Sequence, residues 1–185
     1  MIRYETARTP SELQQILALQ SANLPHVISK EERQKEGFVT VQHSPELLKS
    51  MNDHSPHIIA KDRQKVIGYS LTMDKVFGDQ IPVLVPMFDQ INGLLYKNKA
   101  LSSIDYIVMG QVCIDKNYRG QGIFEGLYQR MKLEYAHRHP CVITEVDVLN
   151  NRSIRAHQKV GFDHLNTYTS PDEKKWVIMI WEWKP

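Results

Sequence analysis

The sequence predicts an α+β fold, in which helices flank a mixed, mostly antiparallel sheet of about six to seven strands. Residues 57–61 and 65–75, and again 164–169 and 176–183, are pairs of strand-like segments joined by short polar turns, as in antiparallel hairpins. Between the two pairs, an apolar run over 105–115 leads through two glycines into a helical pattern. These observations indicate strands paired in hairpins at both ends of the chain and a strand-loop-helix unit at its centre.

The N-terminal region begins with a predicted strand over residues 2–6. Residues 9–12 (Thr-Pro-Ser-Glu) combine an N-cap, a proline at the first helical position and a capping-box glutamate. We expect a helix to begin there and to end before Pro25, because the residue before a proline avoids the helical region. A second capping box at 29–32 predicts a short charged helix that Gly37 closes.

The other elements follow the same kinds of signal. Before the central strand we expect an extended segment over 38–42, a helix capped by Ser44 and a short helix over 87–96. After it we expect a helix that follows Gly122, with an inward stripe of Ile123, Leu127, Met131 and Tyr135. A strand over 141–149 and a helix capped by Asn150 or Asn151 and ended by Gly161 come next. Residues 77–104 are irregular and too long for a simple connection, so we expect an insert that lines a functional site.

Length and composition favour a single domain spanning residues 1–185. A formal net charge of +2 gives no argument for nucleic acid or an acidic membrane as a partner. Cys113 and Cys141 both lie in apolar strand-like runs without metal-ligand spacing, which favours reduced thiols, a cytoplasmic location and no metal. The N-terminus lacks a secretory apolar stretch, and no run is long enough to span a bilayer.

The glycine-containing loop after the central strand is a candidate site for a pyrophosphate. A strand that turns through glycines into a helix presents backbone N–H groups at the positive end of the helix dipole. A P-loop would need Lys and then Ser or Thr after Gly122, where the chain has Ile123 and Phe124. A dinucleotide fingerprint would need glycine at position 125, but the next glycine is Gly126.

The loop resembles that of the GNAT N-acetyltransferase superfamily, whose motif is [Gln/Arg]-x-x-Gly-x-[Gly/Ala]. Residues 119–124 (Arg-Gly-Gln-Gly-Ile-Phe) match it except at Phe124, where a small residue is usual. That difference implies either that the Phe124 side chain turns away from the phosphates or that CoA binds less tightly. A second stretch, residues 150–162, resembles the family's later motif Asn-x-x-[Ala/Ser]-x-x-x-Tyr-x-x-x-Gly-Phe, with His157 in place of the tyrosine.

The resemblance covers roughly residues 38–184 and is strongest over 107–162. It implies an α/β/α layered GNAT fold whose sheet is splayed at the cofactor site, and acetyl-CoA as co-substrate. The expected cofactor-binding residues come from the central strand, the loop and the later motif: Gln111, Val112, Cys113, Arg119, Gly120, Gln121, Gly122, Ile123, Phe124, Asn150 and Ser153. Asn150 can equally be a plain helix cap.

The implied reaction is attack of an amine on the acetyl thioester, which requires the amine to lose a proton. Strand alternation puts Glu145 and Asp147 on one face. If that face lines the cleft, Glu145 accepts the amine's proton directly or through a water, and Asp147 holds a cationic acceptor. Alternatively, both acids pair with Lys or Arg from a covering helix.

The departing thiolate needs a proton, which in many relatives comes from the tyrosine that His157 replaces. A histidine supplies that proton only as an imidazolium, so the replacement narrows the working pH range or abolishes the role. His157 is otherwise a flat filler between helix and cofactor, with Tyr168 and Tyr106 as fallback donors. Cys113 has no sequence-adjacent base that would make it a nucleophile.

Three functions remain open at this stage. The first is an N-acetyltransferase that acts on a primary amine of a small molecule or amino acid, as a monomer or homodimer. The second is a protein N-terminal or lysine acetyltransferase. The third is a catalytically impaired CoA-binding sensor or scaffold, which the two departures from the motifs keep open.

Overall fold

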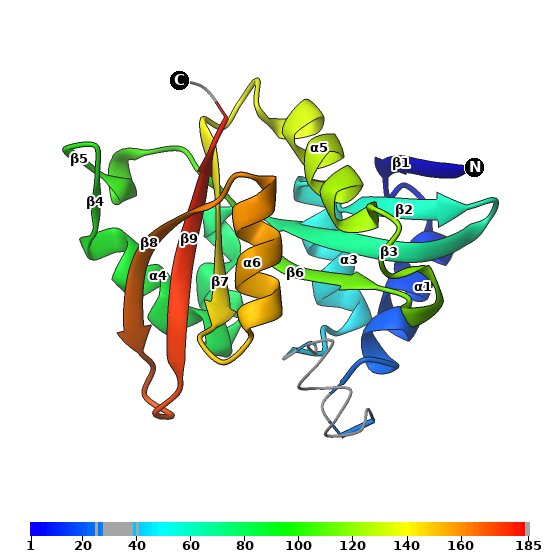
Figure 1. Ribbon diagram of the computed structural model, residues 1–185, viewed down its shortest axis with the longest axis horizontal. Helices are drawn as coiled ribbons and strands as arrows, with labels where there is room; N and C mark the ends of the chain where they lie inside the picture. The colour runs from blue at the N-terminus through cyan, green and yellow to red at the C-terminus, as the bar shows by residue number, and fades with distance from the viewer. Residues whose placement is uncertain (25, 28–38, 40, 184–185) are drawn as a thin grey trace. The chain divides into compact units, whose positions relative to one another are not determined.

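The computed structural model describes residues 1–24, 26–27, 39 and 41–183 (Figure 1). Within these residues, seven strands form one mixed sheet in the order β1-β2-β3-β6-β7-β9-β8. The strands are β1 Ile2–Thr6, β2 Ile58–Asp62, β3 Lys65–Met73, β6 Ile107–Ile114, β7 Cys141–Asp147, β8 Asp163–Thr169 and β9 Lys175–Glu182. The helices are α1 Pro10–Ser21, α3 Pro45–His54, α4 Val85–Gly93, α5 Ile123–Tyr135 and α6 Asn151–Val160. The predicted α+β class, with a mixed, mostly antiparallel sheet flanked by helices, is confirmed.

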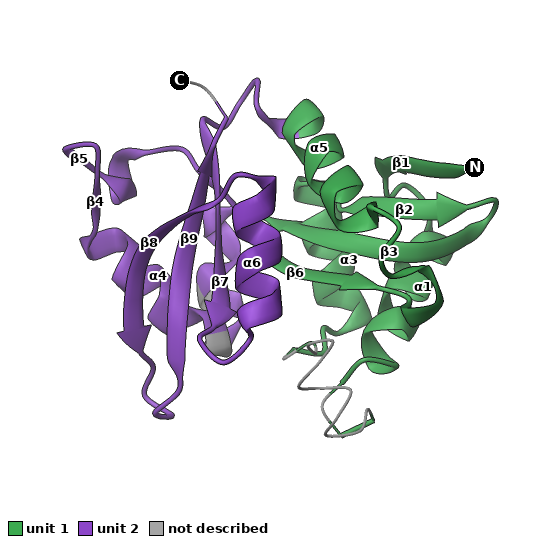
Figure 2. Cartoon of the chain, viewed as in Figure 1, with its two compact units in different colours: residues 1–73, 109–134 green, residues 74–108, 135–185 purple. Residues whose placement is uncertain are grey.

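The chain divides into two compact units, each of which is described by itself (Figure 2). Unit 1 comprises residues 1–73 and 109–134, and unit 2 comprises residues 74–108 and 135–185. Strand β6 contributes residues to both units, because its first two residues belong to unit 2 and the rest to unit 1.

Unit 1 begins with the predicted strand and capped helix. β1 pairs antiparallel with β2, and β2 pairs antiparallel with β3. The capping box of α1 is present, since the Glu12 amide donates to Thr9 Oγ1 at 3.2 Å and the Thr9 amide donates to Glu12 Oε2 at 3.0 Å. Ser44 likewise caps α3 by accepting from the Leu47 amide at 3.1 Å. The helix predicted from residues 29–37 lies outside the described residues.

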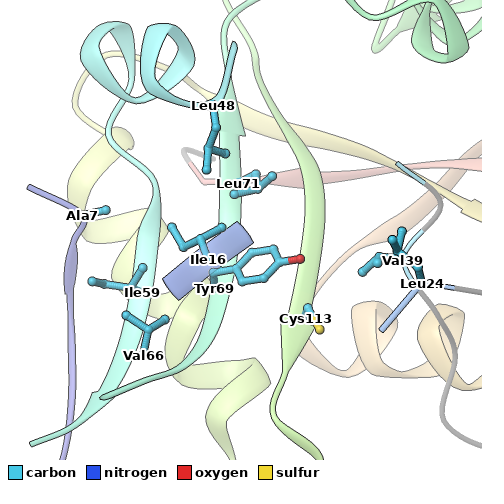
Figure 3. Close-up of a cluster of buried hydrophobic side chains, with 10 residues drawn as sticks. All are labelled: Ala7, Ile16, Leu24, Val39, Leu48, Ile59, Val66, Tyr69, Leu71 and Cys113. Atoms are coloured by element: carbon cyan, nitrogen blue, oxygen red, sulfur yellow. The ribbon is translucent and has the colours of Figure 1, made fainter. Parts of the chain in front are cut away.

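The hydrophobic core of unit 1 lies between the sheet and its helices (Figure 3). Ile16 of α1 and Leu48 of α3 are fully buried and cluster with side chains of β2, β3 and β6. The cluster consists of Ala7, Ile16, Leu24, Val39, Leu48, Ile59, Val66, Tyr69, Leu71 and Cys113. The predicted stripe on α5 is also buried, with Ile123, Leu127, Met131 and Tyr135 all at most 1% exposed.

The sheet of unit 2 has two distinct faces. β7 and β8 both pair antiparallel with β9, and β6 runs parallel to β7 through Ile107↔Val142. The end of α6 packs on the face that carries Trp181, since the rings of Phe162 and Trp181 lie 5.8 Å apart. Because Trp181 pairs with Val142 and side chains alternate, Glu145 points to the opposite face. Figure 1 shows α4 on that side of the sheet and α6 on the other.

The stretch over 77–104 is structured and belongs to unit 2. It contains short 3-10 turns, α4 and a two-stranded hairpin of β4 Leu95–Tyr96 with β5 Lys99–Ala100. The helix predicted over 87–96 therefore begins earlier, at Val85, and ends at Gly93, because residues 95–96 pair with another strand instead of continuing the helix. The buried hydrophobic residues of the 77–104 stretch are Phe77, Ile81, Leu84, Met87, Phe88, Ile91 and Leu101.

Both cysteines are free and buried, as predicted. Burial raises the pKa of Cys113 and of Cys141 to about 12, so both thiols stay protonated at neutral pH. Among the described residues, no helix combines the length and the apolar character needed to cross a bilayer.

Candidate active site

The glycine loop of unit 1 connects β6 to α5 through a short 3-10 turn. Asp115 caps this turn by accepting from the Asn117 amide at 3.0 Å. Gly120 and Gly122 then adopt φ angles of +77° and +75°, which side chains with a Cβ rarely adopt. The two glycines of the motif are thus required by the backbone path that turns the strand into the helix.

The loop leaves room beside its backbone for a ligand. A Cβ built at Gly120 or Gly122 would meet no heavy atom within 4 Å. The first intrahelical bond of α5 runs from the Gly126 amide to the Gly122 carbonyl at 3.0 Å, so the amides of the first turn, which begins at Ile123, have no acceptor within the helix. Open space, first-turn amides and the helix dipole together fit an anionic group such as a pyrophosphate.

Two side chains of the loop are directed toward the protein. Arg119 donates from Nη2 to Asn23 Oδ1 at 3.0 Å and from Nε to the Ile114 carbonyl at 3.3 Å. The ring of Phe124 lies 5.0 Å from that of Tyr128, one turn further along α5. Of the two consequences that the sequence left open for Phe124, this packing supports a side chain turned along the helix.

The predicted cofactor-binding residues of β6 differ in the environment of their side chains. Gln111 and Cys113 are buried, whereas Val112, between them, is partly exposed. The Gln111 amide group is occupied by hydrogen bonds within unit 1. The Gln111 side chain is therefore already engaged, and an extended ligand at this strand would have to be bound through other groups.

In unit 2, Glu145 of β7 forms a hydrogen-bonded pair with Tyr168 of β8. The Tyr168 hydroxyl donates to Glu145 Oε2 at 2.7 Å. Burial raises the pKa of Glu145 to about 7, although the Tyr168 hydrogen bond opposes part of this effect. Burial also raises the pKa of Tyr168 well above its usual range, and the neighbouring carboxyl adds to the shift. A pKa of about 7 allows Glu145 both to accept and to release a proton near neutral pH.

Asp147 lies on the same face of β7 as Glu145. Its Oδ1 accepts from the Leu149 amide at 2.8 Å, which fixes the turn after the strand. Within the described part of the chain, neither Glu145 nor Asp147 forms an ion pair with a lysine or arginine. The pairing with basic residues of a covering helix, which the sequence left open, is not seen in these residues.

The later motif forms the start of α6. Asn150 is the N-cap, and its Oδ1 accepts from the Ser153 amide at 3.1 Å. His157 is 1% exposed, with Nδ1 at 2.8 Å from the Ser153 carbonyl and its ring 5.1 Å from that of Phe162. Burial lowers the pKa of His157 to about 4, so the imidazole is neutral at pH 7.

Two features of these sites were not predicted from the sequence. Tyr168 was considered only as a proton donor to the thiolate, and its contact with Glu145 depends on the β8-β9 register, which places Tyr168 opposite Trp176. The buried hydrogen bonds around Gln111 join residues far apart in the chain, such as Gln20 at 91 positions away. No local pattern signals either contact. Among the described residues, no cluster of three or more His, Cys, Asp or Glu side chains could hold a metal ion.

The mixed sheet and the strand-glycine loop-helix unit are the features expected of an acetyltransferase fold. Residues 24–162 match the family model described as the acetyltransferase (GNAT) family. This chain belongs to the GNAT acetyltransferase family, and it is an acyltransferase. A comparison of the sequence with curated proteins found no match.

Solved structures of acetyltransferases are similar over the full length of the chain. The ribosomal-protein-S18-alanine N-acetyltransferase from Escherichia coli has 13% identity and a TM-score of 0.65, with 100% of this chain and 96% of that chain covered. The NatC complex bound to Gag peptide and CoA gives 14% identity and a TM-score of 0.67, with 98% of each chain covered. A putative acetyltransferase from Salmonella typhimurium, yncA with its cofactor acetyl-CoA, has 10% identity and a TM-score of 0.64, with 100% of this chain and 95% of that chain covered. At these identities the likeness shows the shared fold.

Proposed function

We propose that this protein transfers an acetyl group from acetyl-CoA to a primary amine of a small molecule or amino acid by direct attack, with Glu145 as the general base. The observation that carries the proposal is the partly buried Glu145–Tyr168 pair, with Oη to Oε2 at 2.7 Å and the Glu145 pKa at about 7. A general base is most effective when its pKa lies near the working pH.

The residues that would hold acetyl-CoA are those of the glycine loop and of β6. Backbone amides of residues 119–124 would donate to the pyrophosphate, and main-chain groups of residues 111–113 would pair with the pantetheine arm. Asn150 and Ser153 would reach the cofactor from α6. When bound, acetyl-CoA supplies an activated acyl group with a thiolate leaving group. Two of the similar structures were solved with CoA or acetyl-CoA, which supports this assignment.

Proton transfer is the step that Glu145 would perform. An aliphatic amine is only about one part in a thousand neutral at pH 7, so it must lose a proton before its nitrogen can attack the acetyl carbon. Glu145 in its carboxylate form takes this proton, directly or through a water. The Tyr168 hydroxyl orients the carboxylate by donating to one oxygen, which leaves the other oxygen for the acceptor.

Collapse of the tetrahedral intermediate breaks the carbon–sulfur bond and releases the CoA thiolate. Because the reference pKa of a thiol is about 8.5, the thiolate takes up a proton readily at pH 7 and needs little help from an acid. His157 as an imidazolium is one proposed donor. Its lowered pKa, about 4, favours instead the filler role or a proton delivered by solvent.

A protein N-terminus is the second candidate acceptor. It is favoured by two of the similar structures, a ribosomal-protein-S18-alanine N-acetyltransferase and the NatC complex bound to Gag peptide and CoA. The structured 77–104 segment, with α4 on the Glu145 side of the unit 2 sheet, supports the proposal that it forms an acceptor-site wall and that the acceptor is small. A panel of small amines and short peptides, assayed with acetyl-CoA for thiol release, distinguishes the two candidates.

The test of the base is Glu145→Gln, which keeps the shape of the side chain and removes proton acceptance. We expect kcat at pH 7 to fall by roughly 10²-fold to 10⁴-fold, and the loss to shrink at higher pH, where the amine is already neutral. Asp163→Asn, at an exposed position of β8, is the matched control and should leave kcat unchanged.

Equal losses at both pH values would assign Glu145 a packing or binding role. If the parent protein binds CoA but no amine or peptide stimulates thiol release, the sensor or scaffold function replaces the enzyme proposal.

A further inference from the structure

A buried network of four polar side chains in unit 1 has no part in the mechanism above. Its members are Gln20 of α1, His43 in the segment before α3, Tyr69 of β3 and Gln111 of β6. Gln20 and Tyr69 are fully buried, and His43 and Gln111 are each 7% exposed. We refer to these four residues as the Gln20 network.

The hydrogen bonds of the Gln20 network have fixed directions. Gln111 Oε1 accepts from Gln20 Nε2 at 2.7 Å and from the Tyr69 hydroxyl at 2.6 Å, which uses both of its lone pairs. Gln20 Nε2 also approaches His43 Nδ1 at 2.9 Å, and this imidazole is neutral because burial lowers its pKa to about 4. The Gln20 side chain therefore uses both of its amide hydrogens inside the network.

The network ties the backbone of residues 41–43 to β6. Gln111 Nε2 donates to the Val41 carbonyl at 2.9 Å, and the His43 amide donates to Gln20 Oε1 at 2.8 Å. Breaking one of these bonds would leave a buried polar group without a partner, which is unfavourable because the group has lost its contact with water. A displacement of β6 at Gln111 is therefore transmitted to Val41 and His43 instead of being absorbed by a loose contact.

A second connection joins the glycine loop to the same part of the chain. Arg119 Nη2 donates to Asn23 Oδ1 at 3.0 Å, and the Asn23 carbonyl accepts from the Val39 amide at 3.2 Å. Asn23 is itself buried and anchored to α1 by donation to the Leu19 carbonyl at 2.8 Å. The proposed pyrophosphate loop and the proposed pantetheine strand each hold one part of residues 39–43.

We infer that Gln111 and Arg119 are positioning residues that couple CoA binding at β6 and the glycine loop to the backbone of Val39, Val41 and His43. The inference rests on the proposed function, in which the main chain of β6 receives the cofactor. CoA would reduce the excursions of β6 and the loop, and the buried hydrogen bonds would pass this restraint to the backbone of Val39, Val41 and His43.

Amide hydrogen exchange with CoA as the probe tests the coupling. In the parent protein, saturating CoA should slow exchange of the His43 and Val39 amides by about 5-fold or more, which is the usual lower range of coupling between sites. Gln111→Met keeps the length of the side chain and cuts the link to β6, so the His43 effect should fall below about 2-fold. The Val39 effect, which runs through Arg119, should persist.

Gln15→Met is the matched control, since Gln15 also lies on α1 and accepts from a backbone amide, that of Val66 at 2.8 Å, but has no link to β6. It should leave the CoA effect on His43 intact. If Gln111→Met fails to fold, Tyr69→Phe removes one donor to Gln111 and should reduce the His43 effect about twofold or more.

Calorimetry with CoA separates the two ways in which the idea can fail. Lack of CoA binding by the parent protein would overturn the proposed function and the coupling together. Normal CoA binding with unchanged exchange at His43, or an equal CoA effect in Gln111→Met and the parent, would overturn the coupling alone.

Discussion

Glu145 and His157 are titratable residues of unit 2, the first partly buried and the second buried, and desolvation moves their pKa values in opposite directions. Desolvation disfavours the charged form of each group, which is the anion for a carboxyl and the cation for an imidazole. The pKa of Glu145 therefore rises to about 7, and that of His157 falls to about 4. The same physical effect brings one residue into the range useful at neutral pH and takes the other out of it.

This contrast gives a prediction for His157. At pH 7 an imidazole with a pKa of about 4 is protonated in only about one molecule in a thousand. We therefore expect His157→Phe to keep kcat within about threefold of the parent and to leave the pH profile of kcat unchanged. Stopped-flow measurement of thiol release under chemistry-limited conditions checks this.

The imidazolium role predicts a different result for the same variant. A loss of about tenfold to a hundredfold in kcat, together with a flatter alkaline side of the pH profile of kcat, would show that His157 protonates the thiolate. In that case His157→Tyr should restore activity and move the alkaline side of the profile toward higher pH, since tyrosine stays protonated to about pH 10.

At the scale of elements, the start of α5 contains two glycines that are needed for different reasons. Gly122 has a φ of +75° and open space beside it, whereas a Cβ at Gly126 would lie 2.2 Å from the ring of Tyr4. Gly122 thus serves the backbone path of the loop, and Gly126 lets the helix approach β1 closely. The sequence pattern by itself shows only two glycines four positions apart.

The two glycines should respond differently to substitution. Gly122→Glu should abolish CoA binding in calorimetry while the protein stays folded, because the side chain fills the space beside the loop. Gly126→Ala should leave CoA affinity within about twofold and lower the free energy of unfolding by about 1 to 3 kcal/mol, measured by urea denaturation, through steric overlap.

Tyr4→Ala combined with Gly126→Ala is the control for the Gly126 result. It removes the ring that the new methyl group would strike, so the two changes should be less destabilising together than the sum of the single changes. Additive losses would show that Tyr4 is not the cause. Unchanged CoA affinity in folded Gly122→Glu would place the pyrophosphate elsewhere.

At the scale of the whole molecule, buried titratable groups in both units make stability depend on pH. Burial lowers the pKa values of His43 and His57 in unit 1 to about 4 and about 3, and that of His157 in unit 2 to about 4. Unfolding releases these residues to a pKa near 6.5, so the unfolded chain binds more protons between pH 6.5 and about 4. Stability must fall as pH falls through this window.

Glu145 changes the free energy of unfolding in the opposite direction between pH 4.5 and 7. Its folded pKa, about 7, lies above the value in the unfolded chain, so the folded protein binds the extra proton and loses stability as pH rises. We expect urea denaturation to show a free energy of unfolding that falls from pH 6.5 to pH 4.5 by on the order of 1 kcal/mol per pH unit for each histidine, less the contribution of Glu145.

Glu145→Gln should make this acid dependence steeper, and it should be more stable than the parent at pH 8 but not at pH 4. The residue would then gain activity at a cost in stability, which is common for catalytic groups. A flat profile between pH 6.5 and 4.5 would contradict the neutral buried histidines, and equal stability of the parent and Glu145→Gln at pH 8 would contradict the raised pKa of Glu145.

The sequence by itself determined the features that depend on neighbours along the chain. The caps at Thr9 and Ser44, the hairpin of β2 with β3 and the strand-glycine loop-helix unit all follow from local geometry. Helix capping, turn formation and apolar periodicity are decided within a few residues, so a pattern of letters carries them. The GNAT motifs belong to this class, and they were sufficient for the family and for the class of enzyme.

The tertiary structure alone decided the environment of each side chain. The pairing of Tyr168 with Glu145, the burial of His157 and the contacts of Gln111 with Gln20 all depend on strand register and packing between segments far apart in the chain. The pKa of a carboxyl or an imidazole is set by desolvation and by its hydrogen bonds, and neither is encoded by spacing in the sequence. For this reason the sequence could nominate Glu145 and His157 equally, whereas the folded chain keeps His157 neutral at pH 7 and brings the pKa of Glu145 to about 7, which supports the proposal that Glu145 is the base.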